Sequence, residues 1–260
     1  MRISRSTIIS GCLVALFLFA GCNGVAPQGD VGSGNHGPDL PLKHLPERPG
    51  HLTNGSVVSY ATQYETAYAY NSTDLEASTN PGTLTNISVG VSSQLLSRTS
   101  HGYIVETSPS VGTTSQYNGN TLSGDPGRPS PSVFYYVTEN ATERVALPPV
   151  FHTGRSTVAV VNFDNKTRSI RTSAAVLRTN RTFTANQTTL ATGQGAKILR
   201  VNASSQRPLR LTITLDKGRT RHATIRSEPT YLPSRGWFRI GTVIFITPSG
   251  DAISVPYYQD

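Results

Sequence analysis

Cysteine is nearly absent from this chain of 260 residues. The two cysteines, Cys12 and Cys22, lie inside or directly after an apolar segment near the N-terminus. No residue after position 22 can therefore form a disulfide or supply a thiolate to a metal. The folded part of the chain must be stabilised by its hydrophobic cores rather than by covalent cross-links.

Catalytic motifs are absent as well. The sequence contains no G-x-S-x-G, no H-E-x-x-H and no paired cysteines. The segment Gly193-Gln194-Gly195-Ala196-Lys197 lacks both the full spacing of a phosphate-binding loop and the Ser or Thr that follows its lysine, so it predicts a β-turn. We therefore assign no catalytic residue, metal ligand or cofactor, and we expect a protein that is not an enzyme.

Charged residues are scarce, at 15 % of the chain, and unevenly distributed. Residues 22–149 carry five Lys and Arg against ten Asp and Glu, whereas residues 150–260 carry sixteen against five. The basic half has two interpretations, a surface for polyanions such as acidic glycans or the solvated outer face of a β-sandwich. The candidates for a polyanion surface are Arg168, Arg171, Arg200, Arg210, Arg219 and Arg221.

An export signal is predicted for residues 1–21. Arg2 and Arg5 precede an apolar run from Ile8 to Phe19, and Ala20-Gly21 supplies the small residues before a cleavage site. The run is shorter than the ~20 residues that a spanning helix needs, which favours a cleaved signal over a retained anchor. Export and the absence of a recognisable nucleic-acid-binding motif both argue against nucleic acid as a partner.

The segment Leu18-Phe19-Ala20-Gly21-Cys22 resembles the lipobox of prokaryotic lipoproteins. The resemblance implies that Cys22 receives a lipid, becomes the first residue of the mature protein and anchors it to the outer face of the cell membrane. The alternative, Cys22 as an ordinary small residue or a free thiol, stays open. Residues 22–50, rich in Gly, Pro and Asn, predict a flexible tether between the anchor and a folded body.

One helix is expected after the tether. Thr53 or Asn54 can cap it, apolar side chains recur at helical spacing from Val57 to Tyr68, and Asn71 offers a stop. Period-two segments near 84–96, 102–108, 132–138 and 143–147 predict strands, with a turn from Asn118 to Pro131. Residues 51–148 are therefore expected to form a small α+β domain, one helix on an antiparallel sheet, ending at Pro148-Pro149.

Residues 150–260 are expected to form an all-β sandwich. Strands are predicted near 156–163, 169–178, 181–185, 196–202, 208–216 and 219–226, followed by a C-terminal hairpin across Pro248-Ser249-Gly250. The order of the strand segments in this half resembles the Ig-like modules of prokaryotic surface proteins. The segments are STVAVVNFDNKTRSI, TLATGQGAKILRV and LRLTITLDKGRT. With the lipobox, the tether and the helix phrase SVVSYATQYETAYAYN, the whole chain resembles the surface lipoproteins of halophilic archaea, although its net charge of +8 differs from their usual acidity.

Two further groups of candidate residues follow from this organisation. A helix on a sheet can enclose a pocket, and tyrosines are the candidates to line it: Tyr64, Tyr68, Tyr103, Tyr135 and Tyr136. Such a pocket is the basis of the alternative function, a solute-binding or enzymatic lipoprotein. Eight Asn-X-Ser/Thr sequences predict an extracellular glycoprotein, with candidate acceptors at Asn54, Asn71, Asn86, Asn140, Asn165, Asn180, Asn186 and Asn202. Acidic glycans and proteins of the cell envelope are the expected partners besides the membrane.

Overall fold

The fold is taken from a computed structural model. It describes residues 40–77, 83–124, 131–147, 155–176, 182–202, 209–216, 219–225, 231–232, 236–237 and 239–259. All of them lie in one compact unit, Gly32–Asp260. The expected signal peptide, Cys22 and the first part of the expected tether lie outside the described residues.

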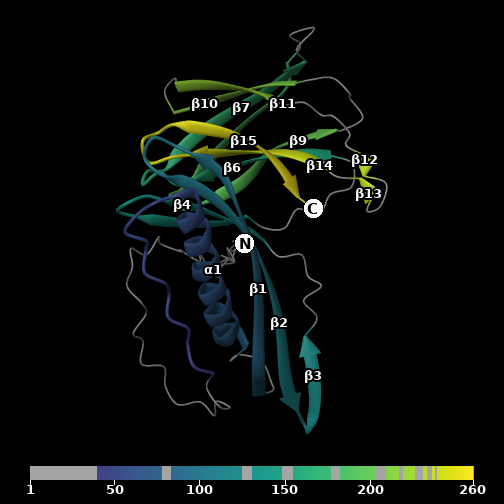
Figure 1. The fold of residues 1–260 in the computed structure, drawn as a ribbon. Helices are drawn as coiled ribbons and strands as arrows, with labels where there is room; N and C mark the ends of the chain where they lie inside the picture. The colour runs from purple at the N-terminus through teal and green to yellow at the C-terminus, as the bar shows by residue number, and fades with distance from the viewer. Residues whose placement is uncertain are drawn as a thin grey trace, which may run out of the picture. The chain divides into compact units, whose positions relative to one another are not determined.

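The described chain contains one helix and mostly antiparallel strands (Figure 1). The elements are α1 (Asn54–Ala77), β1 (Thr83–Arg98), β2 (Tyr103–Tyr117), β3 (Asn120–Gly124), β4 (Ser132–Val137), β5 (Thr142–Leu147), β6 (Arg155–Asn162), β7 (Arg168–Val176), β8 (Thr182–Leu190), β9 (Gly195–Asn202), β10 (Leu209–Leu215), β11 (Arg219–Ile225), β12 (Tyr231–Leu232), β13 (Gly236–Trp237), β14 (Arg239–Ile246) and β15 (Ala252–Gln259). The prediction of one helix followed by antiparallel β-structure is confirmed.

Helix α1 begins as predicted but is longer than predicted. The Thr53 hydroxyl accepts from the Ser56 N–H at 3.1 Å, which identifies Thr53 as the cap rather than Asn54. The expected stop at Asn71 is wrong, because the helix continues to Ala77. The Asn71 side-chain amide bonds to the backbone of Lys43 instead of competing for the backbone of α1.

The first sheet has the order β1-β2-β4-β5, and β3 pairs with the outer part of β2. Strand β3 falls inside the predicted turn from Asn118 to Pro131, so the first part of that prediction is wrong. Asn118 and Gly119 have φ of 48° and 78° and form a two-residue hairpin turn that pairs Tyr117 with Asn120. The Asn-Gly dipeptide was the sequence signal for this hairpin.

Strand β4 explains how this sheet is covered on both faces. All six of its residues are buried, and alternate residues belong to different cores. Val133, Tyr135 and Val137 pack with Val57 and Ala61 of α1. Phe134 and Tyr136 point the other way and pack with strands of the second half of the chain, among them β6 and β14.

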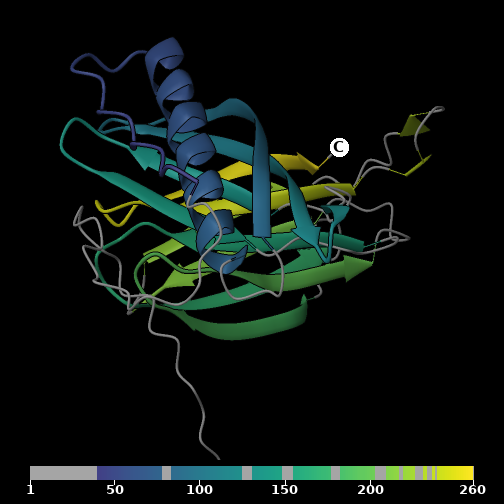
Figure 2. The ribbon, with the colours of Figure 1, turned by 90° about the horizontal axis from the view of Figure 1, so that it is seen from below.

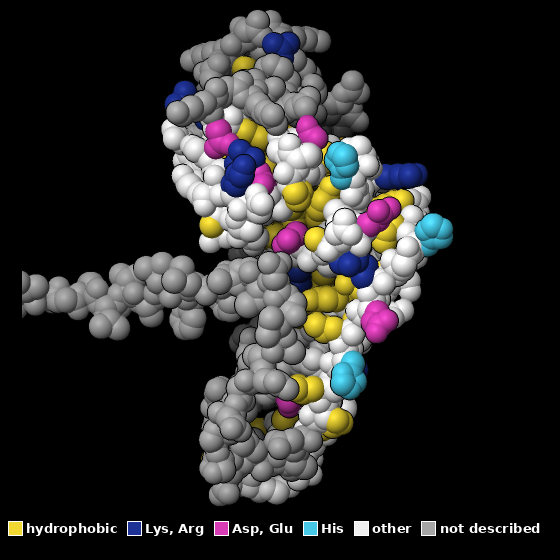
Figure 3. All heavy atoms as spheres, turned by 90° about the vertical axis from the view of Figure 1, so that its left-hand side faces the viewer, with side chains coloured by type: hydrophobic (Ala, Val, Ile, Leu, Met, Phe, Trp, Pro, Cys, Tyr) yellow, Lys and Arg dark blue, Asp and Glu magenta, His cyan; other side chains and the backbone are white. Residues whose placement is uncertain are grey.

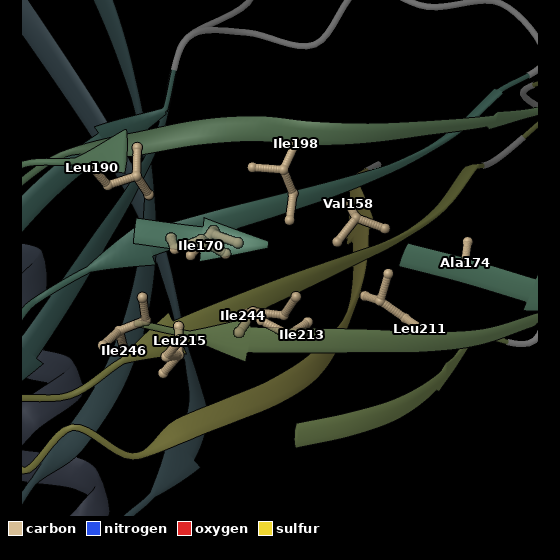
Figure 4. Packing of buried hydrophobic residues seen from close by; sticks show 11 residues of the cluster. Val158, Ile170, Ala174, Leu190, Ile198, Leu211, Ile213, Leu215, Ile244 and Ile246 are labelled. Carbon is tan, nitrogen blue, oxygen red and sulfur yellow. The ribbon is translucent and has the colours of Figure 1, made fainter. Parts of the chain in front are cut away.

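The second half contains two four-stranded sheets, β15-β14-β6-β9 and β11-β10-β7-β8. Within the described part of the chain, the pairing of β6 with β14 is parallel and the other ladders are antiparallel. The two sheets pack face to face through branched aliphatic side chains (Figure 4). This core consists of Val158, Val160, Ile170, Ala174, Leu190, Ile198, Leu211, Ile213, Leu215, Ile244 and Ile246.

The sheet β15-β14-β6-β9 is itself covered on both faces. Val243 and Phe245 of β14 pack against Phe134 of the first sheet, whereas Ile244 and Ile246 belong to the sandwich core. The cores therefore separate four layers, which are α1 and three sheets (Figure 2). The middle core contains residues from both sides of the expected boundary at 148–149. Pro148 and Pro149 themselves lie outside the described residues.

Candidate functional site

The deepest charged group between α1 and the first sheet is Glu65, whose side chain is 1 % exposed. Arg144 of β5 donates to it twice, from Nε to Oε2 and from Nη2 to Oε1, each at 2.9 Å. This bidentate geometry matches a planar guanidinium to a carboxylate. A third donor is the Tyr135 hydroxyl, 2.5 Å from Glu65 Oε2.

Aromatic rings enclose this pair, and together they form what we call the Glu65 cluster: Tyr64, Glu65, Tyr68, Tyr135 and Arg144. The Arg144 guanidinium lies 3.8 Å from the centre of the Tyr68 ring, a cation–π contact. Tyr64 contacts Tyr135 edge to face, with 5.7 Å between ring centres.

The electrostatics of the Glu65 cluster keep its protons in place. Burial, and then the Glu65 charge, raise the pKa of Tyr135 far above its usual range, so the phenol stays protonated and donates. Burial acts to lower the pKa of Arg144, but its hydrogen bonds to Glu65 and the nearby Glu65 charge together raise the pKa, so the guanidinium stays charged. Burial is also the main reason that the pKa of Tyr64 is raised.

The arrangement does not expose a reactive atom. Each Glu65 oxygen already accepts a bond from Arg144, and the side chains of Glu65 and Tyr135 are almost fully covered. A general base needs a free lone pair within reach of substrate, and a nucleophile needs a path to it. The cluster therefore suits a fixed connection between α1 and β5 better than acid–base chemistry.

The five tyrosines predicted to line a pocket do not line one space. Tyr64, Tyr68 and Tyr135 meet in the Glu65 cluster. Tyr103 lies on the same face of the sheet, but its hydroxyl donates to the Leu52 carbonyl at 3.1 Å. Tyr136 lies on the opposite face, stacked on Phe163 with 5.6 Å between ring centres, because neighbouring strand residues alternate.

A second polar cluster lies at one end of the sandwich. The fully buried Asn162 donates from Nδ2 to the carbonyls of Lys166, Leu190 and Ala191, and its Oδ1 accepts from the Asp164 N–H. Asn162 thereby joins the end of β6 to the turn before β7 and to the end of β8.

Arg168 neutralises two carboxylates beside this asparagine. It bonds to the buried Asp164 and to the more exposed Asp216. Asp216 also accepts from the Ser169 N–H at 3.0 Å, and its own backbone has φ of 47°. The hydrogen bond from Arg168 is the main cause that lowers the pKa of Asp216.

The candidate polyanion residues are distributed over different parts of the sandwich. Arg168 is engaged by the two aspartates, whereas the side chains of Arg171 on β7 and Arg210 on β10 are exposed. Arg200 lies on β9 in the other sheet, paired with Thr157. Arg219 and Arg221 lie on β11. Their backbone partners on β10, Leu215 and Ile213, belong to the buried core. The side chains of Arg200, Arg219 and Arg221 lie outside the described residues.

The candidate glycosylation sites also differ in accessibility. Asn54, Asn86, Asn140 and Asn165 are exposed, at the start of α1, in β1 and in two turns. Asn71 is partly covered, and both polar atoms of its amide bond to the Lys43 backbone at 2.9 Å, so the nitrogen that would carry a glycan is already used. Asn180 and the side chains of Asn186 and Asn202 lie outside the described residues.

The β-turn predicted for the segment 193–197 is confirmed only at its start, because Gly193 and Gln194 lie in a turn and β9 already begins at Gly195. Gly193 has φ of 69°, and its N–H donates to the Asn162 carbonyl at 3.0 Å. A Cβ at Gly195 would lie 2.3 Å from Leu147 Cδ2, so this glycine permits β9 to approach β5 closely. These two constraints account for the glycines.

Metal ligands and membrane-spanning helices are two further features that could define a site. Among the described residues, no group of three or more His, Cys, Asp or Glu side chains comes together in a way that could hold a metal. In that same part of the chain, no helix combines the length and apolar character that crossing a membrane requires.

Sequence reasoning brought Tyr64, Tyr68 and Tyr135 together but missed the Glu65–Arg144 pair among them. The signal was a charged residue on the apolar face of α1, because Glu65 follows Val57 and Ala61 at intervals of four. A buried carboxylate needs a partner, but the sequence did not indicate which cation 79 positions away would provide it.

Comparison with known proteins gives no relative from which a site could be inferred. The chain matches no family model, no curated protein and no solved structure. The function therefore has to be argued from its own residues.

Proposed function

We propose that the chain is an exported protein, anchored by a lipid on Cys22 to the outer face of the cell membrane, that acts as a non-catalytic binding or structural module. The observation that carries the proposal is the segment Leu18-Phe19-Ala20-Gly21-Cys22 at the end of a signal-like apolar run. The lack of any later cysteine is consistent with a thiol retained for attachment rather than for folding.

The described body supports a non-catalytic role. Its cores are filled by aliphatic and aromatic side chains, and the carboxylates of Glu65 and Asp164 are paired with Arg144 and Arg168. The exposed sequons at Asn140 and Asn165 support an outward-facing glycoprotein.

The sandwich is proposed to be Ig-like. Two four-stranded sheets packed face to face through a common core support this assignment. The parallel pairing of β6 with β14, which places the first strand of the sandwich beside one of its last, is compatible with such a module. Its outer face, where Arg171 and Arg210 are exposed, is the proposed contact for acidic glycans.

The anchor is tested by intact mass and detergent partitioning of the native protein beside Cys22→Ser, with Cys12→Ser as the matched control. We expect the native and Cys12→Ser proteins to begin at Cys22, carry lipid mass and enter the detergent phase, because two acyl or alkyl chains give stable anchoring. Cys22→Ser should remain aqueous. Identical N-termini and partitioning for all three proteins would refute the anchor.

A further inference from the structure

The segment before α1 folds back along the helix. The backbone N–H of Lys43 donates to Asn71 Oδ1 and its carbonyl accepts from Asn71 Nδ2, both at 2.9 Å. The Lys43 ammonium lies 4.3 Å from the centre of the Tyr70 ring. The chain that leads back toward Cys22 therefore leaves the body beside the C-terminal half of α1, not at the N-terminus of the helix.

Exposed large hydrophobic side chains concentrate on the elements around that exit. Among the described residues, five such side chains are more than about one-third exposed. They come from the segment before α1, from α1 itself and from the β2–β3 hairpin: Leu42 (67 %), Leu45 (47 %), Tyr68 (40 %), Tyr117 (46 %) and Leu122 (52 %). Figure 3, which faces the left-hand side of Figure 1, shows hydrophobic side chains, in yellow, reaching the surface among polar ones on that face.

The neighbouring β-structure is uncharged. We call residues 83–93 of β1, 107–117 of β2 and strand β3 the arm. None of these residues is Asp, Glu, Lys, Arg or His. In Figures 1 and 2 the arm runs alongside α1, and its β2–β3 end lies on the same side as the C-terminal half of the helix. Exposed strands normally carry charges that discourage contact, so an uncharged arm is suited to a contact.

We propose that this end of the molecule, the arm with the segment 40–45, rests on the lipid surface to which the protein is anchored. This inference rests on the proposed anchor at Cys22. About 18 residues separate Cys22 from Leu40, which limits the distance between them to roughly 65 Å even in a fully extended chain. Leu and Tyr side chains suit the boundary between headgroups and acyl chains, and the arm, which has no Asp, Glu, Lys, Arg or His, brings no ionised group to be desolvated there.

The occupant is a lipid surface rather than a polyanion. The exposed Arg171 and Arg210 lie in the sheet β11-β10-β7-β8, which Figure 1 shows away from the arm. Lys43 is already engaged with Tyr70. The arm and the segment 40–45 are therefore distinguished by exposed apolar side chains, whereas the sheet with Arg171 and Arg210 is distinguished by positive charge.

The test uses a reporter thiol, which this chain permits because it has no cysteine after position 22. The chain from residue 22 with Cys22→Ser retains every described contact. It is tethered by an N-terminal histidine tag to phosphatidylcholine vesicles that contain a nickel-chelating lipid. A fluorophore is attached at Leu122→Cys or, as the matched control, at Arg171→Cys, both exposed positions.

We expect vesicles to reduce the quenching by iodide of the fluorophore at Leu122→Cys several-fold. A nitroxide lipid should quench the fluorophore at this position. The fluorescence at Arg171→Cys should respond to iodide equally with and without vesicles. Adding Tyr117→Ser and Leu42→Ser should restore iodide access at position 122, whereas Arg210→Ser should not. Equal quenching at both positions, or protection at position 171 instead, would overturn the proposal. So would protection at position 122 on nickel beads without lipid, which would indicate contact between copies.

The tag replaces the lipid, so this result does not depend on modification of Cys22. If the native protein proves to lack a lipid, the anchor fails by intact mass while the tethered chain still reports whether the arm meets lipid. If the native protein is lipidated and position 122 stays open to iodide, the anchor stands and the contact fails.

Discussion

The Glu65 cluster and the Asn162–Arg168 cluster use the same chemistry in opposite settings. In the Glu65 cluster one guanidinium meets one carboxylate, and the partners come from elements 79 positions apart. At the end of the sandwich one guanidinium meets two carboxylates, one of them only four positions away, and Asp216 is open to solvent. One cluster connects a helix to a strand in the interior, and the other joins the ends of strands at a partly solvated end of the sandwich.

The setting determines what each cluster contributes. Replacing both partners of a buried ion pair by apolar residues changes the free energy of unfolding little. Removing only one partner is strongly destabilising, because it leaves a buried charge without compensation. A solvated pair is screened, and its loss costs little. The two clusters should therefore respond very differently to equivalent substitutions.

The largest effect is expected for Arg144→Met. The change leaves the Glu65 carboxylate buried with Tyr135 as its remaining donor and should lower the free energy of unfolding by about 3–5 kcal/mol. The midpoint of urea denaturation measures the loss. The double variant Glu65→Leu/Arg144→Met is the control, because it removes both charges and should recover most of the stability. A double variant as unstable as the single one would show that the charge is not the cause.

The contrast between the clusters also shows what could be predicted from sequence. Strand positions from β6 to β11 followed from alternation of side chains such as Leu211 and Ile213, because period two is a local property, although β8 continues to Leu190, beyond the predicted 181–185. The layer order could not be predicted, since β4 is apolar on both faces and its sequence does not say what covers each one. The Glu65–Arg144 pairing was hidden for the same reason: it depends on packing between elements distant in the chain.

A smaller loss is expected for Asn162→Ala at the sandwich end. The change removes the donor to the carbonyls of Lys166, Leu190 and Ala191 and should cost about 2–3 kcal/mol, mainly because the bond to the Leu190 carbonyl is buried. Chemical denaturation of the unglycosylated protein checks it. Asn165→Ala, an exposed asparagine in the same turn, should change stability by less than about 0.5 kcal/mol. Similar losses for both would contradict a special role for Asn162.

Tyr135→Phe isolates the neutral donor of the Glu65 cluster. It removes one hydrogen bond to a charged acceptor and should cost about 1.5–2 kcal/mol. Because the pKa of Tyr135 is raised in the folded state, the wild type should lose stability as the pH rises above about 10, the ordinary tyrosine value, and the variant should lose less. Denaturation at neutral and alkaline pH measures both effects.

Tyr136→Phe is the matched control for that change. It removes a neighbouring hydroxyl on the opposite face of β4, which bonds to the neutral Thr99 hydroxyl at 3.2 Å. Its cost should be about 1 kcal/mol or less. If Tyr136→Phe were the more damaging of the two, the charged acceptor would not be what makes Tyr135 important.

The smallest effect is expected for Asp216→Asn, which keeps a residue that tolerates positive φ while removing the charge. Exposure of Asp216 limits the loss at neutral pH to less than about 1 kcal/mol, and salt should reduce it further. Because the folded pKa is lowered, the wild-type advantage should be present above the ordinary aspartate pKa of about 4 and disappear as the pH falls below it. Denaturation from pH 7 to pH 3, with and without salt, tests this. An advantage that persists in acid would mean that the backbone turn, rather than the ion pair, distinguishes Asp216.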